Sequence, residues 1–178
     1  MEVSQLKNVL ILNGSPRKNG ATASLVKAFT EGAEQSGNKV RELYLYSMNI
    51  NDCTGCLACQ RRGKTETQNP CLQQDDMVQI YEAFRKADVI VFASPIYYWT
   101  ITGKLKSAVD RMLAMNMALG MEGYRRSSIL LSTAAGNDYT LATEWHQNFN
   151  RVLDWTILGN VLGTGKEEEA YALGASIL

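Results

Sequence analysis

The chain has 178 residues, which is enough for one domain with a full hydrophobic core. Its 18 Lys and Arg residues balance its 18 Asp and Glu residues, and both signs are spread along the sequence, which argues against a nucleic-acid surface or a basic membrane patch. The first five residues are polar, so no signal peptide is expected, and no apolar run is long enough to cross a bilayer. We therefore predict a cytoplasmic protein whose thiols stay reduced.

Segments with strand and helix patterns alternate along the chain. Short apolar runs bounded by turn residues predict strands at residues 9–12, 39–46, 87–93, 128–132 and 160–164. Amphipathic spacing predicts helices at residues 22–36, from Asp75 or Asp76 onward, at 102–114, from Asp138 to a stop at Gly159, and at 166–178. In the helix after Asp138, the residues predicted to face the core are Leu141, Trp145, Phe149 and Val152. Asp110 and Arg111 are predicted to form a structural ion pair.

This alternation indicates an α/β protein with a parallel sheet and helices on both faces. We predict one domain over residues 1–178, a flavodoxin-like three-layer sandwich with five strands in the order 2-1-3-4-5. In that order a ligand binds outside the carboxyl ends of the strands, between the first and the third. The loops after strands one, three and four, at residues 14–22, 94–100 and 133–137, should therefore form the site.

The loop at residues 14–22 connects a strand to the start of a helix, where free N–H groups favour a bound anion. A Walker loop would place Lys and then Ser or Thr after Gly20, but Ala21 follows, and the glycine pattern of a dinucleotide site is absent. The loop does contain hydroxyl, amide and guanidinium side chains. They fit a single phosphate monoester held without metal, and the alternative is an ordinary turn capped by Thr22.

Three aromatic residues follow the third strand, at Tyr97, Tyr98 and Trp99. They can stack on a flat heterocycle, or they can cover a subunit interface or the next helix. The backbone N–H groups after Pro95 are expected to be free for the polar edge of such a ring. The three loops together favour a flavin mononucleotide (FMN) site. No catalytic side chain is expected, because the chemistry would take place on FMN, and the single histidine, His146, suits redox chemistry better than hydrolysis.

All four cysteines lie in the polar segment at residues 47–74, as Cys53, Cys56, Cys59 and Cys71. The spacing of the first three is typical of a [4Fe–4S] site, but eleven residues separate Cys59 from Cys71. Four thiolates could also hold zinc. Free thiols that shape a substrate pocket are favoured over the cluster, and zinc ranks last.

Several motifs carry a family resemblance: Gly14-Ser15-Pro16-Arg17 through Thr22, the cysteine run with Cys71 before Asp75-Asp76-Met77, Ser94-Pro95-Ile96-Tyr97, Gly103-Lys104-Leu105-Lys106 and Asp110-Arg111. With them the chain resembles the NAD(P)H-dependent FMN reductases of the flavodoxin-like superfamily, near the iron–sulfur flavoproteins. The resemblance implies an oxidoreductase that passes electrons from NADH or NADPH to a quinone, flavin, nitro or azo compound or protein. The alternative is an iron–sulfur flavoprotein that carries electrons to a protein partner. A homodimer or homotetramer is expected.

The resemblance also implies roles for individual residues. The phosphate would be held by Ser15, Arg17, Asn19, the N–H of Ala21, and Thr22. The isoalloxazine ring would be lined by Pro95, Ile96, Tyr97 and Tyr98, with Thr133, Ala134 and Gly136 closing the site. Any cluster would be held by Cys53, Cys56, Cys59 and Cys71. The chain departs from the family at Ala21, where Asn is frequent, and in the long spacer before Cys71.

Overall fold

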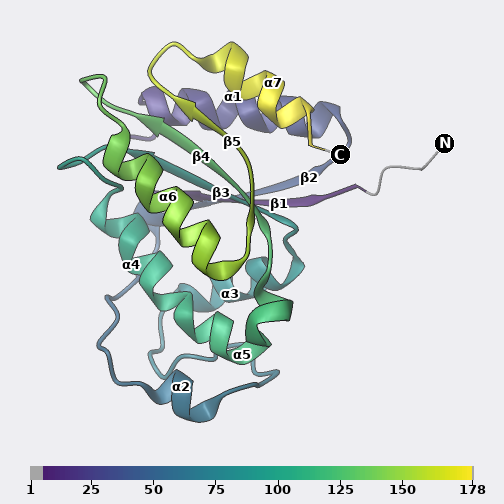
Figure 1. The fold of residues 1–178 in the computed structure, drawn as a ribbon, viewed down its shortest axis with the longest axis vertical. Coiled ribbons are helices and arrows are strands. Elements are labelled where there is room, and N and C mark those ends of the chain that lie inside the picture. The colour runs from purple at the N-terminus through teal and green to yellow at the C-terminus, as the bar shows by residue number, and fades with distance from the viewer. Residues whose placement is uncertain (1–5, 178) are drawn as a thin grey trace.

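A computed structural model describes residues 6–177, and its centre is a five-stranded parallel sheet (Figure 1). The strands are β1 (Asn8–Asn13), β2 (Lys39–Tyr44), β3 (Val89–Pro95), β4 (Ser127–Thr133) and β5 (Thr156–Leu162). Their order is β2-β1-β3-β4-β5, which confirms the predicted flavodoxin-like topology. The predictions for residues 1–5 and for a helix end at Leu178 lie outside the described residues.

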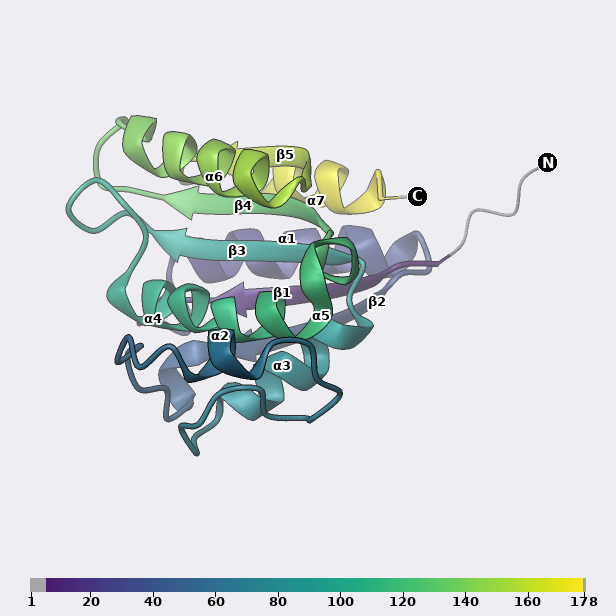
Figure 2. The same cartoon turned by 60° about the horizontal axis from the view of Figure 1, so that its bottom comes forward.

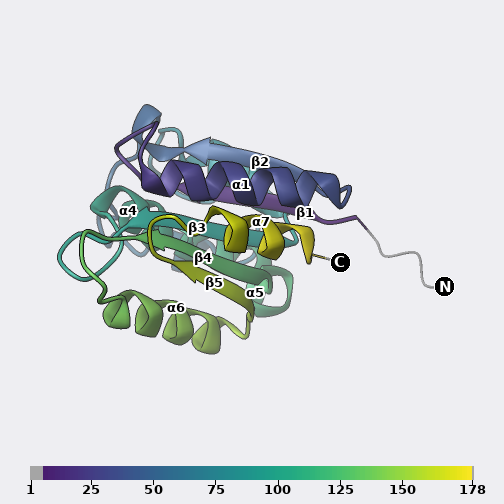
Figure 3. The ribbon, with the colours of Figure 1, turned by 90° about the horizontal axis from the view of Figure 1, so that it is seen from above.

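Helices cover both faces of the sheet, so the molecule has three layers (Figures 1 and 3). One face is covered by α1 (Ala21–Gln35) and α7 (Glu167–Ala175). The other is covered by α3 (Met77–Lys86), α4 (Gly103–Arg111), α5 (Leu113–Tyr124) and α6 (Thr140–Leu153). A short helix, α2 (Ala58–Arg62), packs against α5 on the side away from the sheet (Figure 2).

The alternation of side chains along the strands divides the core into two apolar clusters. In β1, Leu10 and Leu12 face the α3–α6 layer, while Val9 and Ile11 face α1 and α7. Every residue of β3 is buried, as expected for the central strand of a parallel sheet. The sheet is therefore anchored on both faces, and the loops at its carboxyl ends start from fixed points.

Several element boundaries differ from the prediction. β2 ends at Tyr44, because a 3-10 turn (Leu45–Ser47) follows, and β5 begins at Thr156 instead of residue 160. α6 ends at Leu153, where Asp154 adopts a left-handed conformation at φ 55°, so the expected stop at Gly159 is wrong. Gly159 lies inside β5, and neither α2 nor α5 was predicted as a separate helix. Within residues 6–177 no helix is both long and apolar enough to cross a membrane.

The predicted inward face of α6 is confirmed for Trp145 and Phe149, which pack against the core, and is wrong for Leu141 and Val152. Leu141 and Val152 are 52% and 64% exposed, whereas His146 is buried. The reason is a polar network against β4, in which Ser128 Oγ lies 2.8 Å from His146 Nε2 and donates to Asn150 Oδ1 at 2.6 Å. Buried hydrogen bonds to β4 therefore orient the helix together with the packing of Trp145 and Phe149.

Candidate functional site

A cavity of about 340 Å³ lies at the carboxyl ends of β1, β3 and β4, where the fold predicts a ligand site. Its lining comes from the three predicted loops together with the turn after β5. The lining residues are Ser15, Arg17, Gly20, Ala21, Thr22, Pro95, Ile96, Tyr97, Thr133, Ala134, Ala135 and Thr164.

The loop after β1 is held in a defined shape by its own hydrogen bonds. The Ser15 N–H donates to Asn13 Oδ1 at 3.0 Å, and Ser15 Oγ donates to the Arg17 carbonyl at 3.2 Å. Gly14 fits tightly beneath the loop, since a Cβ there would lie 2.7 Å from Leu105 Cβ. Thr102 Oγ1 donates to the Gly14 carbonyl at 2.8 Å and so ties the loop to the start of α4.

The N-terminus of α1 points its first turn at this cavity. No side chain caps the helix at Gly20, and its first turn contains no acidic residue. The first N–H groups and the positive end of the helix dipole therefore remain available for an anion. Thr22 is buried, and its Oγ1 lies 2.7 Å from Thr133 Oγ1, which joins the first loop to the loop after β4.

The loop after β3 is fastened at both ends. The Ile96 N–H donates to the Thr133 carbonyl at 2.8 Å, and the Tyr97 N–H donates to the Thr100 carbonyl at 2.9 Å. These two N–H groups were expected to be free for a ring, and that expectation is wrong. Tyr98 and Trp99 lie in the turn between Tyr97 and Thr100 and have positive φ angles of 48° and 64°. They are 91% and 56% exposed, so their rings project outward.

Most of the predicted cofactor residues meet in this one cavity. Nine of the twelve line it: Ser15, Arg17, Ala21, Thr22, Pro95, Ile96, Tyr97, Thr133 and Ala134. Asn19 lines a different cavity, between α1 and β2, while Tyr98 and Gly136 are exposed at the rim of the loops.

Three lining residues were not predicted, namely Gly20, Ala135 and Thr164. Gly20 and Ala135 fall inside loops that the sequence does single out. Thr164 was missed because the fifth strand was placed at residues 160–164. With the strand ending at Leu162, Thr164 belongs to a fourth loop at the same sheet edge.

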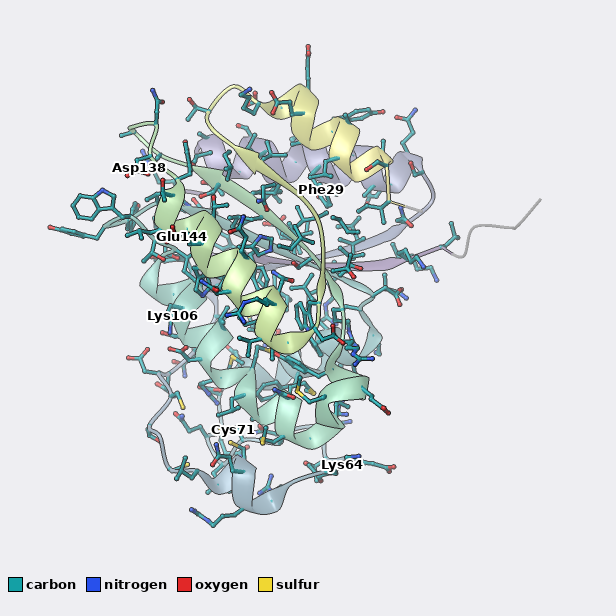
Figure 4. All side chains as sticks on the ribbon, in the orientation of Figure 1. Phe29, Lys64, Cys71, Lys106, Asp138 and Glu144 are labelled. Atoms are coloured by element: carbon teal, nitrogen blue, oxygen red, sulfur yellow. The ribbon has the colours of Figure 1, made fainter. Side chains whose placement is uncertain are left out.

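The four cysteines line a second, smaller cavity of about 50 Å³. All four are free thiols, and the wall is completed by residues of α4 and α5 that include Arg111 and Leu113. Figure 4 shows Cys71 far from Asp138, which lies in the loop after β4, and the two cavities share no lining residue. Among residues 6–177 no three His, Cys, Asp or Glu side chains converge closely enough to hold a metal ion.

The backbone of the cysteine loop is unusual. Gly55 and Leu57 have positive φ angles of 64° and 57°, a conformation that a bulky residue such as leucine rarely adopts. The pKa of Cys56 lies below its ordinary value, chiefly because the Ala58 N–H and the Thr54 hydroxyl donate to its sulfur. A lowered pKa favours the thiolate, which is the form that binds metals.

Arg111 closes this cavity from the side of α4. Its Nη1 is paired with the Asp75 carboxylate and donates to the Asn51 carbonyl at 3.2 Å, and the side chain is almost fully buried. Burial would raise the pKa of Asp75, but hydrogen bonds from Arg111, Asn51 and Met77 outweigh it and lower the pKa. Asp110 pairs instead with Lys106 at the surface, so the predicted Asp110–Arg111 pair is wrong.

Comparisons with known proteins show the family and the fold of the chain. The family profile described as NADPH-dependent FMN reductase matches residues 7–168. An iron-sulfur flavoprotein from Archaeoglobus fulgidus is 34% identical over 163 residues, which are 90% of this chain and 69% of that protein. One from Methanosarcina thermophila is 31% identical over 169 residues, 91% of this chain and 85% of that protein. The chain spans only 53% and 47% of two further iron-sulfur flavoproteins.

A solved structure of RosB with the bound intermediate 8-demethyl-8-formylriboflavin-5'-phosphate has the same fold. It covers 96% of this chain, and 77% of its own length, with a TM-score of 0.75 at 15% identity.

The chain belongs to the NADPH-dependent FMN reductase family. It is an oxidoreductase of the flavodoxin-like fold, with FMN and a reduced nicotinamide as the cofactor and co-substrate of its family.

Proposed function

We propose that the chain binds FMN in the 340 Å³ cavity and acts as an NAD(P)H oxidoreductase. The acceptor would be a quinone, a flavin, a nitro or azo compound, or a protein. When bound, FMN would supply the two-electron chemistry between NADH or NADPH and the acceptor. The observation that carries the proposal is the uncapped N-terminus of α1, which opens into a cavity lined by Arg17 and hydroxyl side chains.

The residues present suit a phosphate monoester. Thr22 offers a hydroxyl, Arg17 offers a guanidinium, and the first N–H groups of α1 offer backbone donors. Ser15 would turn its hydroxyl from the Arg17 carbonyl to the phosphate on binding. Asn19 was expected among the phosphate ligands, but it lines a different cavity, between α1 and β2. We therefore assign phosphate binding to Ser15, Arg17, the Ala21 N–H and Thr22.

The flat ring would lie against the loops after β3 and β4. Pro95, Ile96 and Tyr97 supply apolar and aromatic surface for one ring face. Because the N–H groups of Ile96 and Tyr97 are already paired, the backbone donors for the polar edge would come from Ala134 and Ala135 instead. Hydrogen bonds at that edge tune the flavin potential, so the loop after β4 would set it.

The direct test measures FMN binding and NADPH oxidation by the purified chain. Flavin fluorescence should be quenched on binding, and oxidation of NADPH or NADH should depend on added FMN. Protein that remains colourless after incubation with FMN, or that binds it without any reduction by either nicotinamide, would contradict the proposal.

A second function is favoured by the cysteine cavity. Four thiols from one loop surround a single small cavity beside a buried guanidinium, and this donor set suits a thiolate-bound [4Fe–4S] cluster. The thiols do not yet converge on one point, so Cys53, Cys56 and Cys59 would have to close toward Cys71 on loading. With a cluster the chain would act as an electron carrier to a protein partner. Zinc remains a third occupant for the same thiols.

Anaerobic purification followed by iron, acid-labile sulfide and zinc assays separates these cases. A cluster requires iron and sulfide in comparable amounts, whereas zinc alone would indicate a structural site. If iron, sulfide and zinc are all absent after anaerobic reconstitution, the cysteines are free thiols and the proposed electron-carrier function is contradicted.

We also propose that the chain is cytoplasmic and assembles as a homodimer or homotetramer, as its family resemblance implies. Exposed apolar side chains of α5 and α6 are consistent with assembly. Leu113, Leu141 and Val152 are 38%, 52% and 64% exposed.

A further inference from the structure

Arg111 has hydrogen-bonding capacity that the rest of the fold does not use. The side chain is 2% exposed, and Nη1 is paired with Asp75 and the Asn51 carbonyl. Its Nε and Nη2 atoms are also buried, yet they have no hydrogen-bond partner in the part of the chain that the structure describes. Leaving the donors of a buried charged group unpaired is costly, so these atoms indicate a missing acceptor.

The surroundings of Arg111 show what kind of acceptor would fit. Arg111 lines the cavity that all four cysteines line, and apolar residues such as Leu72 and Leu113 make up much of the remaining wall. The guanidinium therefore shares one small cavity with four thiols, and the acceptor that fits its free donors is an anion bound among those thiols.

A purely structural ion pair explains only half of this arrangement. Pairing with Asp75 accounts for Nη1 and anchors the start of α3, where Asp75 also accepts the Met77 N–H at 3.2 Å. It does not account for Nε and Nη2, which lie on the remaining edge of the guanidinium. A planar group with one edge on Asp75 can present its other donors to a second acceptor.

We infer that Arg111 donates hydrogen bonds from Nε and Nη2 to sulfur atoms of an iron–sulfur cluster held by Cys53, Cys56, Cys59 and Cys71, and that it raises the reduction potential of that cluster. This inference rests on the proposed cluster. A cluster with four thiolate ligands is an anion, and reduction adds negative charge in a site of low dielectric constant. A fixed positive charge and hydrogen bonds to sulfur stabilise the reduced form more than the oxidised form.

The test uses the full chain, reconstituted anaerobically with ferrous iron and sulfide. Iron and acid-labile sulfide are assayed, and the midpoint potential is measured in a redox titration followed by electron paramagnetic resonance. Arg111→Gln should shift the potential to more negative values. Asp75→Asn should shift it to more positive values, because it removes a carboxylate that partly neutralises Arg111. Lys86→Met, which removes an exposed charge at the far end of α3 and outside the cysteine cavity, is the control and should change the potential little.

A general loss of structure would not shift the midpoint potential in opposite directions in Arg111→Gln and Asp75→Asn. If Arg111→Gln does not fold, Arg111→Lys keeps the charge without the planar donors, and a smaller negative shift is expected. If the chain binds a cluster whose potential is the same in the wild type and in both variants, the role of Arg111 is overturned while the proposed cluster is supported. Wild-type protein that takes up no iron overturns the cluster, and this inference with it.

Discussion

Arg17 lines the cavity proposed for FMN, and it provides a sharp test at the scale of one residue. Arg17→Ala removes a charge-assisted hydrogen bond to the phosphate, which should weaken FMN binding by about 1.5–3 kcal/mol, or about 10- to 150-fold. Isothermal titration calorimetry with FMN measures the change. Lys18→Ala is the matched control, because Lys18 is also exposed but lies over the Tyr44 ring, outside the cavity. Equal effects of the two substitutions would place the phosphate elsewhere.

His146 makes the stability of the protein depend on pH. It is the only histidine, and burial lowers its pKa from 6.5 to about 4. As the pH falls, His146 is therefore protonated near pH 6.5 in the unfolded chain but only near pH 4 in the folded chain. The stability contributed by neutral His146 is therefore fully present above pH 6.5 and is lost as the pH falls toward 4, by about 3 kcal/mol in all.

Urea unfolding at pH values between 7.5 and 5 measures this dependence. The free energy of unfolding should fall with pH in the wild type and should be nearly flat in His146→Gln. The window lies above the range of the carboxylates, whose shifts, as at Asp75 and Asp138, are downward from 3.8. An equally steep slope in the variant would show that another group is responsible.

At the same scale, the sequence predicts most site residues but not their partners. Ser15, Arg17 and Thr22 are found because hydroxyls and a cation between a strand and a helix are typical of a phosphate loop. The partner of Arg111 could not be found that way. Asp75 and Arg111 are 36 residues apart and meet only because α3 and α4 pack side by side.

Among the elements, α1 and α7 pack unusually closely. A Cβ at Gly32 would collide with the Tyr171 carbonyl oxygen, and one at Gly174 would collide with the Phe29 carbonyl oxygen. Gly32→Ala should therefore lower the free energy of unfolding by about 1–3 kcal/mol, since the two backbones would have to separate. Urea unfolding measures this cost. Gly103→Ala is the control, because a Cβ there meets nothing within 4 Å, and its stability should be unchanged or slightly higher. Tolerance of Gly32→Ala would mean that the helices are less tightly packed.

The helix α6 shows why the apolar pattern alone can mislead. Trp145 and Phe149 pack against the core as predicted, but Val152 is exposed, and the fully buried residues of the helix are Ala142, His146 and Asn150. A sequence pattern weighs hydrophobicity and cannot see that Ser128, in a different element, offers a partner to His146 and Asn150. The end of the helix was missed for a related reason, because Asp154 supplies the left-handed residue that glycine was expected to supply.

For the whole molecule, strand order was predictable because short apolar runs alternate with helical segments, and such alternation admits few topologies. The structures of the cysteine segment and of α5 could not be predicted from the sequence. They depend on contacts between distant residues, such as the hydrogen bond from the Thr65 N–H to the Ala118 carbonyl.

Assembly is a property of the whole molecule and has a simple test. Sedimentation velocity should give a mass of two or four copies of the 19.7-kDa chain. The double variant Leu141→Gln/Val152→Gln changes exposed side chains of α6, and it should weaken assembly if that helix contributes to the contact. A wild-type chain that sediments only as a monomer would contradict the expected oligomer.

The central claim is that loops after β1, β3 and β4 hold an FMN that a reduced nicotinamide can reduce. An absorption spectrum of anaerobically purified protein, loaded with FMN and then titrated with NADPH and with NADH, tests it most directly. We predict a bound-flavin spectrum that bleaches with one equivalent of at least one nicotinamide per flavin. Protein that binds no flavin, or a bound flavin whose absorption neither nicotinamide changes, would contradict the account.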